Sequence, residues 1–202
     1  HLDYYKDLAD IQDAFRALVR SIPEGGFVVA NQNDPNVAPV LEGAQASVVD
    51  YTKLFDPLLK LRMPGVHMML DAAAALGVAK ALRIDTEVAK QALEDFAGTW
   101  RRSEYLGETA GGAVVFDDYG HHPTEIKAVT QAFKEKFPHK RLVIYFQPHR
   151  YSRTEMCWDQ FTESFALADH VWITNIYPAG EKPIDGITAE KLALAVKNRN
   201  CE

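Results

Sequence analysis

The chain has 202 residues, of which 47% are hydrophobic and 25% charged, so it can form a packed core and is neither disordered nor fibrous. A length of about 100–200 residues per domain allows one large domain or two small ones. The net charge of -6 argues against a general nucleic-acid-binding protein, which needs a basic surface. No apolar run approaches the roughly 18 residues of a membrane span. Cys157 and Cys201 have no metal-ligand spacing, which favours a reduced, intracellular protein.

The first hundred residues predict mixed helices and strands. Apolar residues at helical spacing over 7–22 predict a helix, with Leu8, Ile11, Phe15, Leu18 and Ile22 on one face. Short apolar runs at 27–30 and 46–49 predict strands, whereas 50–62 is ambiguous. Pro64 begins a helix to about Leu82. Asp85 caps another helix, whose inward positions are Val88, Ala89, Ala92, Leu93 and Phe96.

After a glycine-rich joint at 98–112, the pattern becomes regular. Strands are expected at 113–116, 142–146 and 171–174. Helices are expected from Pro123, from Thr154 to Leu167, and after a Thr188 cap with an Ile187–Leu192 staple. This alternation of strands and helices predicts an α/β fold with a parallel sheet and right-handed crossovers.

The loop after the first of these strands, 117–125, carries unusual chemistry. It reads DDYGHHPTE. Ligands bind beyond the carboxyl ends of strands in open α/β sheets, and here the carboxylates, phenol and imidazoles could contact ribose, base and anion. A plain helix cap, with His122 at the cap and Pro123 at the first helical position, is the alternative interpretation, and it is expected to hold for Thr124 and Glu125. For the aspartates and both histidines, His121 and His122, a binding role is favoured.

Two further loops follow the next strands. Residues 147–153, QPHRYSR, place Arg150 and Arg153 near a helix start, where the helix dipole disfavours cations. Two guanidiniums there can bind an anion, although weak surface ion pairs would explain them equally well. Residues 175–183 form a long loop shaped by Gly and Pro, which fits a plain connection as well as a binding role.

Together these stretches resemble the Mur ligase family. The similar segments are DDYGHHPTE, QPHRYSR and YPAGEKP at 177–183, with GTWRR at 98–102 resembling the interdomain linker and MPGVHMMLDAAAA at 63–75 resembling a family helix. The first three residues resemble the end of an EPDHLD segment. The resemblance covers nearly the whole chain and is closest to the members that join L-alanine to UDP-N-acetylmuramate.

The resemblance implies a two-part organisation. Residues 1–98 would be a partial central, ATP-binding domain, and 99–202 a truncated, Rossmann-like C-terminal domain with a parallel sheet. Such a ligase acts in the cytoplasm, in peptidoglycan synthesis for the cell wall. It uses ATP and Mg²⁺ to convert the lactyl carboxylate into an acyl phosphate, which the amine of L-alanine attacks to give the amide, with ADP and phosphate as the other products. Neither a nucleic acid nor a membrane is implied as a partner.

The resemblance also assigns roles by position. The residues matched to the amino-acid substrate and the reacting phosphate are His121, His149, Arg150 and Arg153. The residues matched to the nucleotide are His67, Asp71, Arg102, Asp117, Asp118 and Tyr119. His1 matches a histidine that ligates a magnesium ion.

Three departures from the family pattern modify this expectation. No GTHGKT[ST] phosphate-binding loop and no UDP-binding domain occur in the 202 residues, so both are expected in a full-length chain. Met68 and Asp71 replace asparagines, and Val66 stands where lysine is frequent. The stretch between Tyr51 and Met63 is short. These differences predict that the 202 residues alone do not use ATP.

Three other functions stay open from the sequence. The chain could be a catalytically inactive module that binds nucleotide or amino acid. It could belong to the sister ligase that recycles murein peptides. A dehydrogenase of Rossmann type is disfavoured, because the first loop reads DDYGHHP and not GxGxxG.

Overall fold

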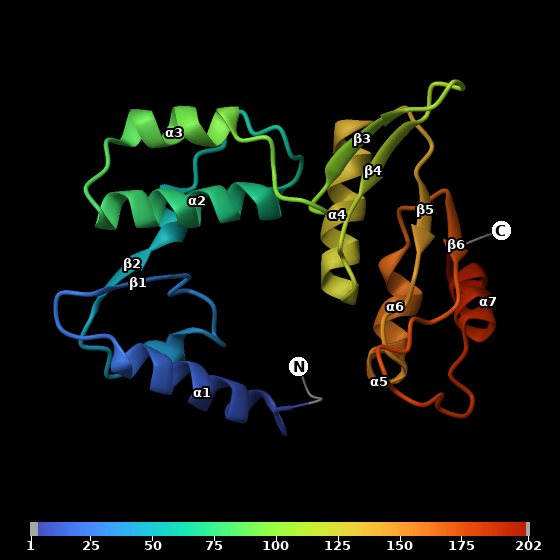
Figure 1. Ribbon diagram of the computed structural model, residues 1–202, viewed down its shortest axis with the longest axis horizontal. Helices are drawn as coiled ribbons and strands as arrows, with labels where there is room; N and C mark the ends of the chain where they lie inside the picture. The colour runs from blue at the N-terminus through green and yellow to red at the C-terminus, as the bar shows by residue number, and fades with distance from the viewer. Residues whose placement is uncertain (1–3, 201–202) are drawn as a thin grey trace. The chain divides into compact units, whose positions relative to one another are not determined.

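The computed structural model describes the backbone of residues 4–200 and the side chains of residues 4–196 (Figure 1). The chain forms two compact units. Unit 1 contains the described residues up to Arg62 together with His67–Phe96. Unit 2 contains Met63–Val66 and the chain from Ala97 onward. No helix in the described residues is long and apolar enough to cross a membrane.

Unit 1 is built around a small parallel ladder. Strands β1 (Phe27–Ala30) and β2 (Ser47–Asp50) pair in parallel. The helical elements are α1 (Leu8–Ser21), the short 3-10 helices η1 (Ala38–Leu41) and η2 (Tyr51–Leu54), α2 (Val66–Ala81) and α3 (Thr86–Asp95). Gly77 lets α2 approach the ladder closely, because a Cβ there would lie 2.8 Å from Val29 Cγ1. The predicted elements of this unit are therefore confirmed, including the Asp85 cap, whose carboxylate accepts from the N–H groups of Glu87 and Val88.

The predicted inward face of α3 is only partly correct, and the apolar face predicted for α1 is largely exposed. In α1, Leu8, Phe15 and Leu18 are about half exposed, and Val19 is the buried residue. In α3 and just after it, Val88 and Phe96 are also exposed. Helical periodicity identifies the apolar face of a helix correctly. A ladder of two four-residue strands, however, has too little surface to cover the apolar faces of both α1 and α3.

Unit 2 contains two ladders and four helices among its described residues, together with the first residue of α2. Strands β3 (Glu104–Glu108) and β4 (Val114–Asp117) pair antiparallel, whereas β5 (Val143–Phe146) and β6 (His170–Ile173) pair in parallel. The helices are α4 (Pro123–Lys136), α5 (Tyr151–Met156), α6 (Trp158–Ser164) and α7 (Ala189–Asn200). The Thr188 cap is confirmed, since its hydroxyl accepts from the N–H of Lys191.

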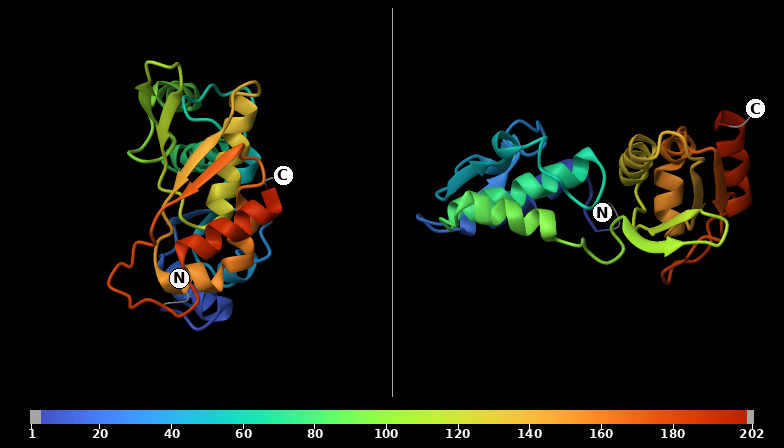
Figure 2. Two further views of the ribbon diagram at one scale, coloured as in Figure 1. Left: turned by 90° about the vertical axis from the view of Figure 1, so that its right-hand side faces the viewer. Right: turned by 90° about the horizontal axis from the view of Figure 1, so that it is seen from above.

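The core of unit 2 lies on one face of the β5–β6 ladder. Helices α6 and α7 lie side by side against it (Figures 1 and 2). The buried cluster consists of Ile126, Phe146, Phe161, Phe165, Leu192 and Val196. Ile144, Val171 and Ile173 pack against this cluster from the same face of the strands. The opposite face carries the exposed rings of Tyr145 and Trp172, which stack at 6.0 Å between centroids.

Three details of unit 2 differ from the sequence-based expectation. The glycine-rich joint at 98–112 contains β3, which pairs with β4 and is interrupted by a bulge between Tyr105 and Gly107. Consequently β4 is not part of one parallel sheet: among the described residues its ladder partner is β3, and no ladder joins it to β5. The expected helix from Thr154 to Leu167 starts at Tyr151 and is broken at Cys157, whose φ of -104° and ψ of 18° separate α5 from α6.

Candidate functional site

Three loops of unit 2 meet beyond the carboxyl ends of β4, β5 and β6. The second and third loops are joined by backbone hydrogen bonds: Tyr177 N–H donates to Pro148 O at 2.8 Å, and Arg150 N–H donates to Tyr177 O at 2.8 Å. The first loop reaches them through His121, whose ring centroid lies 6.0 Å from that of His149. The structure thus brings together the predicted residues of all three loops at one edge of unit 2.

The end of the first loop is a helix cap, as predicted for Thr124 and Glu125, and His122 serves as the cap residue. His122 Nδ1 accepts from the N–H of Thr124, and Pro123 takes the first helical position of α4. Glu125 Oε2 accepts from the N–H groups of His121 and His122, both at 3.0 Å. Burial acts to raise the pKa of Glu125, but these two hydrogen bonds hold it below its usual value. Arg102 lies 3.6 Å from Glu125, which attaches the linker to this cap.

The two aspartates of the first loop have different environments. Asp118 Oδ2 accepts from the N–H of Ser103 at 2.8 Å and from its hydroxyl at 3.2 Å, while Oδ1 accepts from Gly120 N–H at 2.7 Å. Asp117 Oδ2 lies 3.0 Å from Arg101 Nε, and both of these side chains are more than one-third exposed. Asp118 therefore uses both oxygens to hold the loop and linker together, whereas Asp117 is accessible to a ligand.

We expect Asp118→Ala to lower the free energy of unfolding of unit 2 by about 1–3 kcal/mol, because it leaves the buried Ser103 without its acceptor. The matched change Asp117→Ala removes a partly exposed ion pair, so its cost should stay below about 1 kcal/mol. Urea unfolding followed by tryptophan fluorescence measures both. All three tryptophans lie beyond residue 97 and so report on unit 2. Equal decreases in the free energy of unfolding for the two variants would contradict a structural role that is specific to Asp118.

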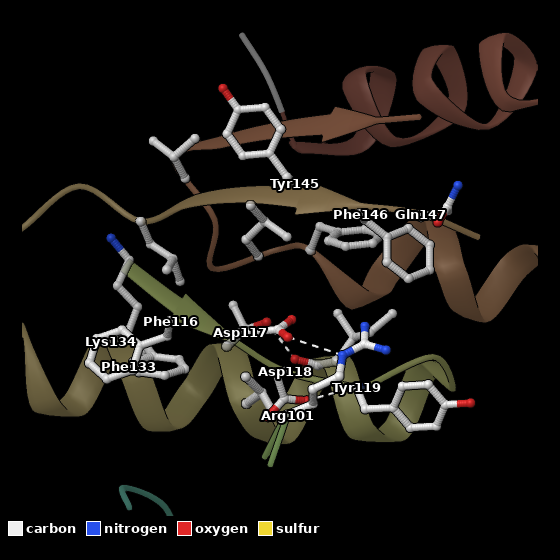
Figure 3. Close-up of a pocket in the computed structure, with 18 of the residues that line it drawn as sticks. Arg101, Phe116, Asp117, Asp118, Tyr119, Phe133, Lys134, Tyr145, Phe146 and Gln147 are labelled. Atoms are coloured by element: carbon white, nitrogen blue, oxygen red, sulfur yellow. Dashed lines mark hydrogen bonds and ion pairs between the residues drawn. The ribbon is translucent and has the colours of Figure 1, made fainter. Parts of the chain in front are cut away.

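Tyr119 offers an aromatic surface beside these carboxylates. The Arg101 guanidinium lies 5.0 Å from the centre of the Tyr119 ring, and Figure 3 shows Arg101 between this ring and Asp117. The ring meets His121 edge-on at 4.9 Å, and His121 Nδ1 lies 2.9 Å from Tyr119 O. Tyr119 remains 43% exposed, so one part of the ring is open to a planar ligand. Sequence reasoning missed Arg101 here, although the Arg101–Arg102 pair was visible in the linker.

Cationic side chains gather in the second loop. Arg153 lies in α5, and one of its guanidinium nitrogens is 3.3 Å from both His149 Nδ1 and His149 O. Arg150 precedes α5 with a φ of 72° and a ψ of 138°, a backbone conformation that normally requires glycine. Non-glycine residues in such conformations concentrate at functional sites, where the side chain is needed at that position. The predicted cationic cluster of His149, Arg150 and Arg153 is therefore present, together with His121.

The third loop contributes a carboxylate and a ring that sequence reasoning did not single out. Glu181 accepts from the N–H of Ser152 at 3.0 Å and from its hydroxyl at 2.6 Å, which lowers the pKa of Glu181. It also lies 4.0 Å from the Arg150 guanidinium. Tyr177 stacks on His149 at 5.3 Å. Both residues occur in the YPAGEKP stretch, but only the fold shows that they touch the second loop.

The surroundings of two histidines of the site lower their pKa values. Burial lowers the pKa of His149, and electrostatic interactions with Arg153, His121 and Arg150 lower it further, against the opposing effect of Glu181. Burial also lowers the pKa of His122, against the opposing effect of Glu125. A neutral imidazole close to guanidiniums can accept a proton or a hydrogen bond, so His149 has the chemistry of a general base.

These depressed values predict a pH dependence of stability. Because each folded-state pKa lies below the ordinary value of 6.5, the unfolded chain binds more protons as the pH falls through this range. The free energy of unfolding should therefore be constant above about pH 7 and fall as the pH drops from about 6.5 toward 5. In His149→Gln the slope of this fall should decrease, whereas His139→Gln, which changes an exposed histidine, should leave it intact. The same slope in the unchanged chain, His149→Gln and His139→Gln would contradict a contribution of His149 to the pH dependence.

The donor set fits an anion better than a cation. Two guanidiniums and two imidazoles can hold phosphate or carboxylate oxygens, and Tyr119 with Asp117 suits a base and a ribose. No cluster of three or more histidine, cysteine, aspartate or glutamate side chains that could hold a metal ion occurs in residues 4–196. His1 lies outside the described residues. We therefore assign no magnesium ligands in the described chain.

The other predicted nucleotide residues lie on α2, in unit 1. His67 is partly buried, and its Nε2 is enclosed with no hydrogen-bond partner among the described residues. Asp71 is exposed on the same helix. The interactions of His67 and Asp71 therefore remain predictions.

Comparison with known proteins gives consistent matches. The model of the Mur ligase, glutamate ligase domain matches residues 101–202. A UDP-N-acetylmuramate–L-alanine ligase of Bdellovibrio bacteriovorus is 38% identical over all of this chain and 50% of its own length. One of Geobacter sp. is 40% identical over 98% of this chain and 48% of its own length. The chain thus spans about half the length of these curated relatives.

Solved structures show the same fold. The UDP-N-acetylmuramate–alanine ligase of Thermotoga maritima superposes with a TM-score of 0.69, at 24% identity, over 98% of this chain and 46% of that chain. The folylpolyglutamate synthase of Mycobacterium tuberculosis, solved with ADP and AMPPCP, gives a TM-score of 0.70 at 20% identity, over 98% of this chain and 49% of that chain. The family model covers half of the sequence and includes all three loops, so the chain belongs to the Mur ligase family.

Proposed function

We propose that the full-length protein containing this chain is an ATP-dependent, ADP-forming ligase that joins L-alanine to UDP-N-acetylmuramate in cytoplasmic peptidoglycan synthesis. The observation that carries the proposal is Arg150, an arginine in a glycine-like backbone conformation beside Arg153 and His149. The similarity to alanine ligases over the whole chain supports the choice of substrate.

The residues of unit 2 suggest how the reaction proceeds. The lactyl carboxylate would attack the γ-phosphate of bound ATP, with ADP as the leaving group, and the resulting acyl phosphate would lose phosphate when the amine attacks. Arg150 and Arg153 would bind and offset negative charge on the carboxylate and phosphoryl oxygens. Neutral His149 would accept the proton that the amine of L-alanine loses when it attacks the activated carbonyl. Tyr119 and Asp117 would bind the base and ribose, and Asp118 would hold their loop in place.

The 202 residues and the full-length protein are expected to differ in their use of ATP. The sequence lacks a GxxxxGK[ST] segment, whose lysine and backbone N–H groups bind the triphosphate in ATP-using proteins. We therefore expect the 202 residues alone to form no ADP. Isothermal titration calorimetry with ATP and with L-alanine would show whether they keep any affinity for either ligand.

The test measures ADP formation by the full-length protein with UDP-N-acetylmuramate and L-alanine. ADP release that requires both substrates, with UDP-N-acetylmuramoyl-L-alanine as product, is the expected result. A protein that is active with a preformed murein peptide and inactive with L-alanine would be the recycling ligase instead. Binding of nucleotide without turnover of either acceptor would identify an inactive binding module.

A further inference from the structure

Helix α5 begins at a residue that cannot cap it. The first N–H groups of an α-helix have no partner inside the helix, and an oxygen of the N-cap side chain usually accepts from them. The N-cap residue of α5 is Arg150, and a guanidinium has only donors. The charges of Arg150 and Arg153 in this first turn are also unfavourable beside the positive end of the helix dipole. The start of α5 therefore needs an acceptor and a negative charge from another part of the fold.

Glu181 of the third loop supplies both. Its Oε2 accepts from the N–H of Ser152 at 3.0 Å, and its Oε1 accepts from the Ser152 hydroxyl at 2.6 Å. Ser152 is the second residue of α5, a position whose N–H an N-cap side chain normally serves. These hydrogen bonds hold the pKa of Glu181 below its usual value, so the carboxylate is charged at neutral pH. Glu181 thus caps α5 from a position 29 residues after Ser152.

A tight turn over 178–181 presents Glu181 to α5. The N–H of Glu181 donates to Pro178 O at 3.0 Å, and Ala179 and Gly180 have φ values of 48° and 87°. Two consecutive positive φ values are typical of a type I′ turn, where glycine, asparagine or aspartate is usual and alanine is strained. Such strain persists only where the surrounding structure imposes it. The turn therefore holds Glu181 at a defined place beside α5.

The third loop also holds Arg150 directly. The N–H of Arg150 donates to Tyr177 O at 2.8 Å, which fixes its backbone. The Arg150 guanidinium lies 4.0 Å from Glu181 Oε1, a distance at which the charges attract without a direct hydrogen bond between these two atoms. Arg153, in contrast, is held by His149 in its own loop. Of the two guanidiniums, Arg150 is therefore the one whose orientation depends on Glu181.

We propose that Glu181 is a positioning residue, which orients the Arg150 guanidinium for the reaction through the Ser152 cap and the ion pair. This inference rests on the proposed function, because it takes the role in charge stabilisation that is assigned there to Arg150. Removing the Glu181 charge would by itself make the site more attractive to an anion. A loss of activity in a variant without this charge therefore reports a loss of orientation and not of electrostatic attraction.

Glu181→Gln in the full-length protein separates the charge from the hydrogen bonds. The amide oxygen can still accept from the Ser152 N–H, and the amide NH₂ can donate to the Ser152 hydroxyl oxygen. The urea midpoint should therefore stay the same, whereas kcat for ADP formation should fall at least about 10-fold, because a small misplacement of a catalytic group is costly. KM for ATP should stay within about twofold, since the proposed nucleotide contacts, Tyr119 and Asp117, lie in the first loop.

Glu155→Gln is the matched control, because it makes the same change at an exposed position of α5 and should leave kcat unaltered. Full or increased activity of Glu181→Gln would overturn the proposal. A loss of activity that merely follows a lower urea midpoint would overturn it as well, since Glu181 would then serve the fold alone.

A double-mutant cycle tests whether Glu181 acts through Arg150. In the Arg150→Gly protein there is no guanidinium to orient, so adding Glu181→Gln should lower kcat by less than about twofold. The same factor in both backgrounds would show that Glu181 acts independently of Arg150, and would overturn the proposal.

NMR of the arginine Nε–H groups tests the positioning without catalysis. In the full-length protein, the Arg150 signal can be identified by its loss in Arg150→Gly. It should differ from the signals of exposed arginines such as Arg83, and in Glu181→Gln it should move toward them. An Arg150 signal that is unaffected in Glu181→Gln would overturn the proposal. If the unchanged protein forms no ADP with UDP-N-acetylmuramate and L-alanine while the signal still moves, the proposed function fails and the positioning of Arg150 by Glu181 stands.

Discussion

Replacement of Arg150 by glycine should reduce the rate of ADP formation by the full-length protein about 10²–10³-fold, the usual effect of losing one group that stabilises developing charge. The same change should leave the fold at least as stable to within about 1 kcal/mol. Glycine adopts a φ of 72° without the strain that arginine has there, and this gain offsets its greater flexibility in the unfolded chain. Steady-state kinetics and urea unfolding measure the two effects separately.

Arg83→Gly is the matched control. Arg83 also has a positive φ, 58°, but it is exposed, just after the end of α2. Glycine is the preferred residue at such a helix end, so this variant should be slightly more stable and fully active. A full-length Arg150→Gly protein with unchanged kinetics would remove Arg150 from the site. A large loss of stability would show that Arg150 serves the fold instead.

Local interactions account for the parts of the fold that the sequence predicts correctly. Asp85 and Thr188 are predicted as helix caps and His122 is a candidate cap, and each accepts a hydrogen bond from the first turn of its helix. A cap involves residues two or three positions apart, so its signal lies within one stretch of sequence. The strands at β1, β2, β5 and β6 were predicted for the same reason, from short apolar runs.

Non-local pairing explains the parts that were missed. Glu104–Glu108 contains a glycine and two charges and becomes a strand only because β4 lies beside it. Ser103 is an ordinary linker residue in the sequence, yet it is buried against Asp118, fifteen positions later. Glu181 and Ser152 are similarly far apart in the chain. No local pattern encodes such partners.

The candidate site also combines features that local sequence predicts with features that depend on non-local contacts. The sequence identified the three loops and most of their charged residues, because charged and aromatic side chains at strand ends are unusual in themselves. It could not distinguish Asp117 from Asp118, since that difference depends on which carboxylate receives Ser103. It also could not reveal the backbone conformation of Arg150, which is imposed by the pairing of His149 with Tyr177 in the third loop.

Phe161→Ala should destabilise unit 2 by about 3–5 kcal/mol, which is the usual cost of removing a fully buried aromatic ring. Phe161 is completely buried, and its ring lies 5.6 Å from that of Phe146. Both rings belong to the buried cluster between the β5–β6 ladder and its helices. The resulting cavity would be surrounded by α6, α7 and β5, which cannot all move inward, because each packs against the others. Urea unfolding followed by tryptophan fluorescence measures the loss in unit 2.

Met156→Ala is the control, since it removes a large apolar side chain that is 51% exposed at the end of the neighbouring helix, and it should cost less than about 1 kcal/mol. The comparison also bears on the site. Phe161 follows the break at Cys157, and α5 before that break carries Arg153. If the core holds α6 in place and α6 in turn fixes α5, then Phe161→Leu, which keeps most of the volume, should preserve both stability and activity. Similar losses of stability in Phe161→Ala and Met156→Ala would show instead that this cluster is not the centre of the unit 2 core.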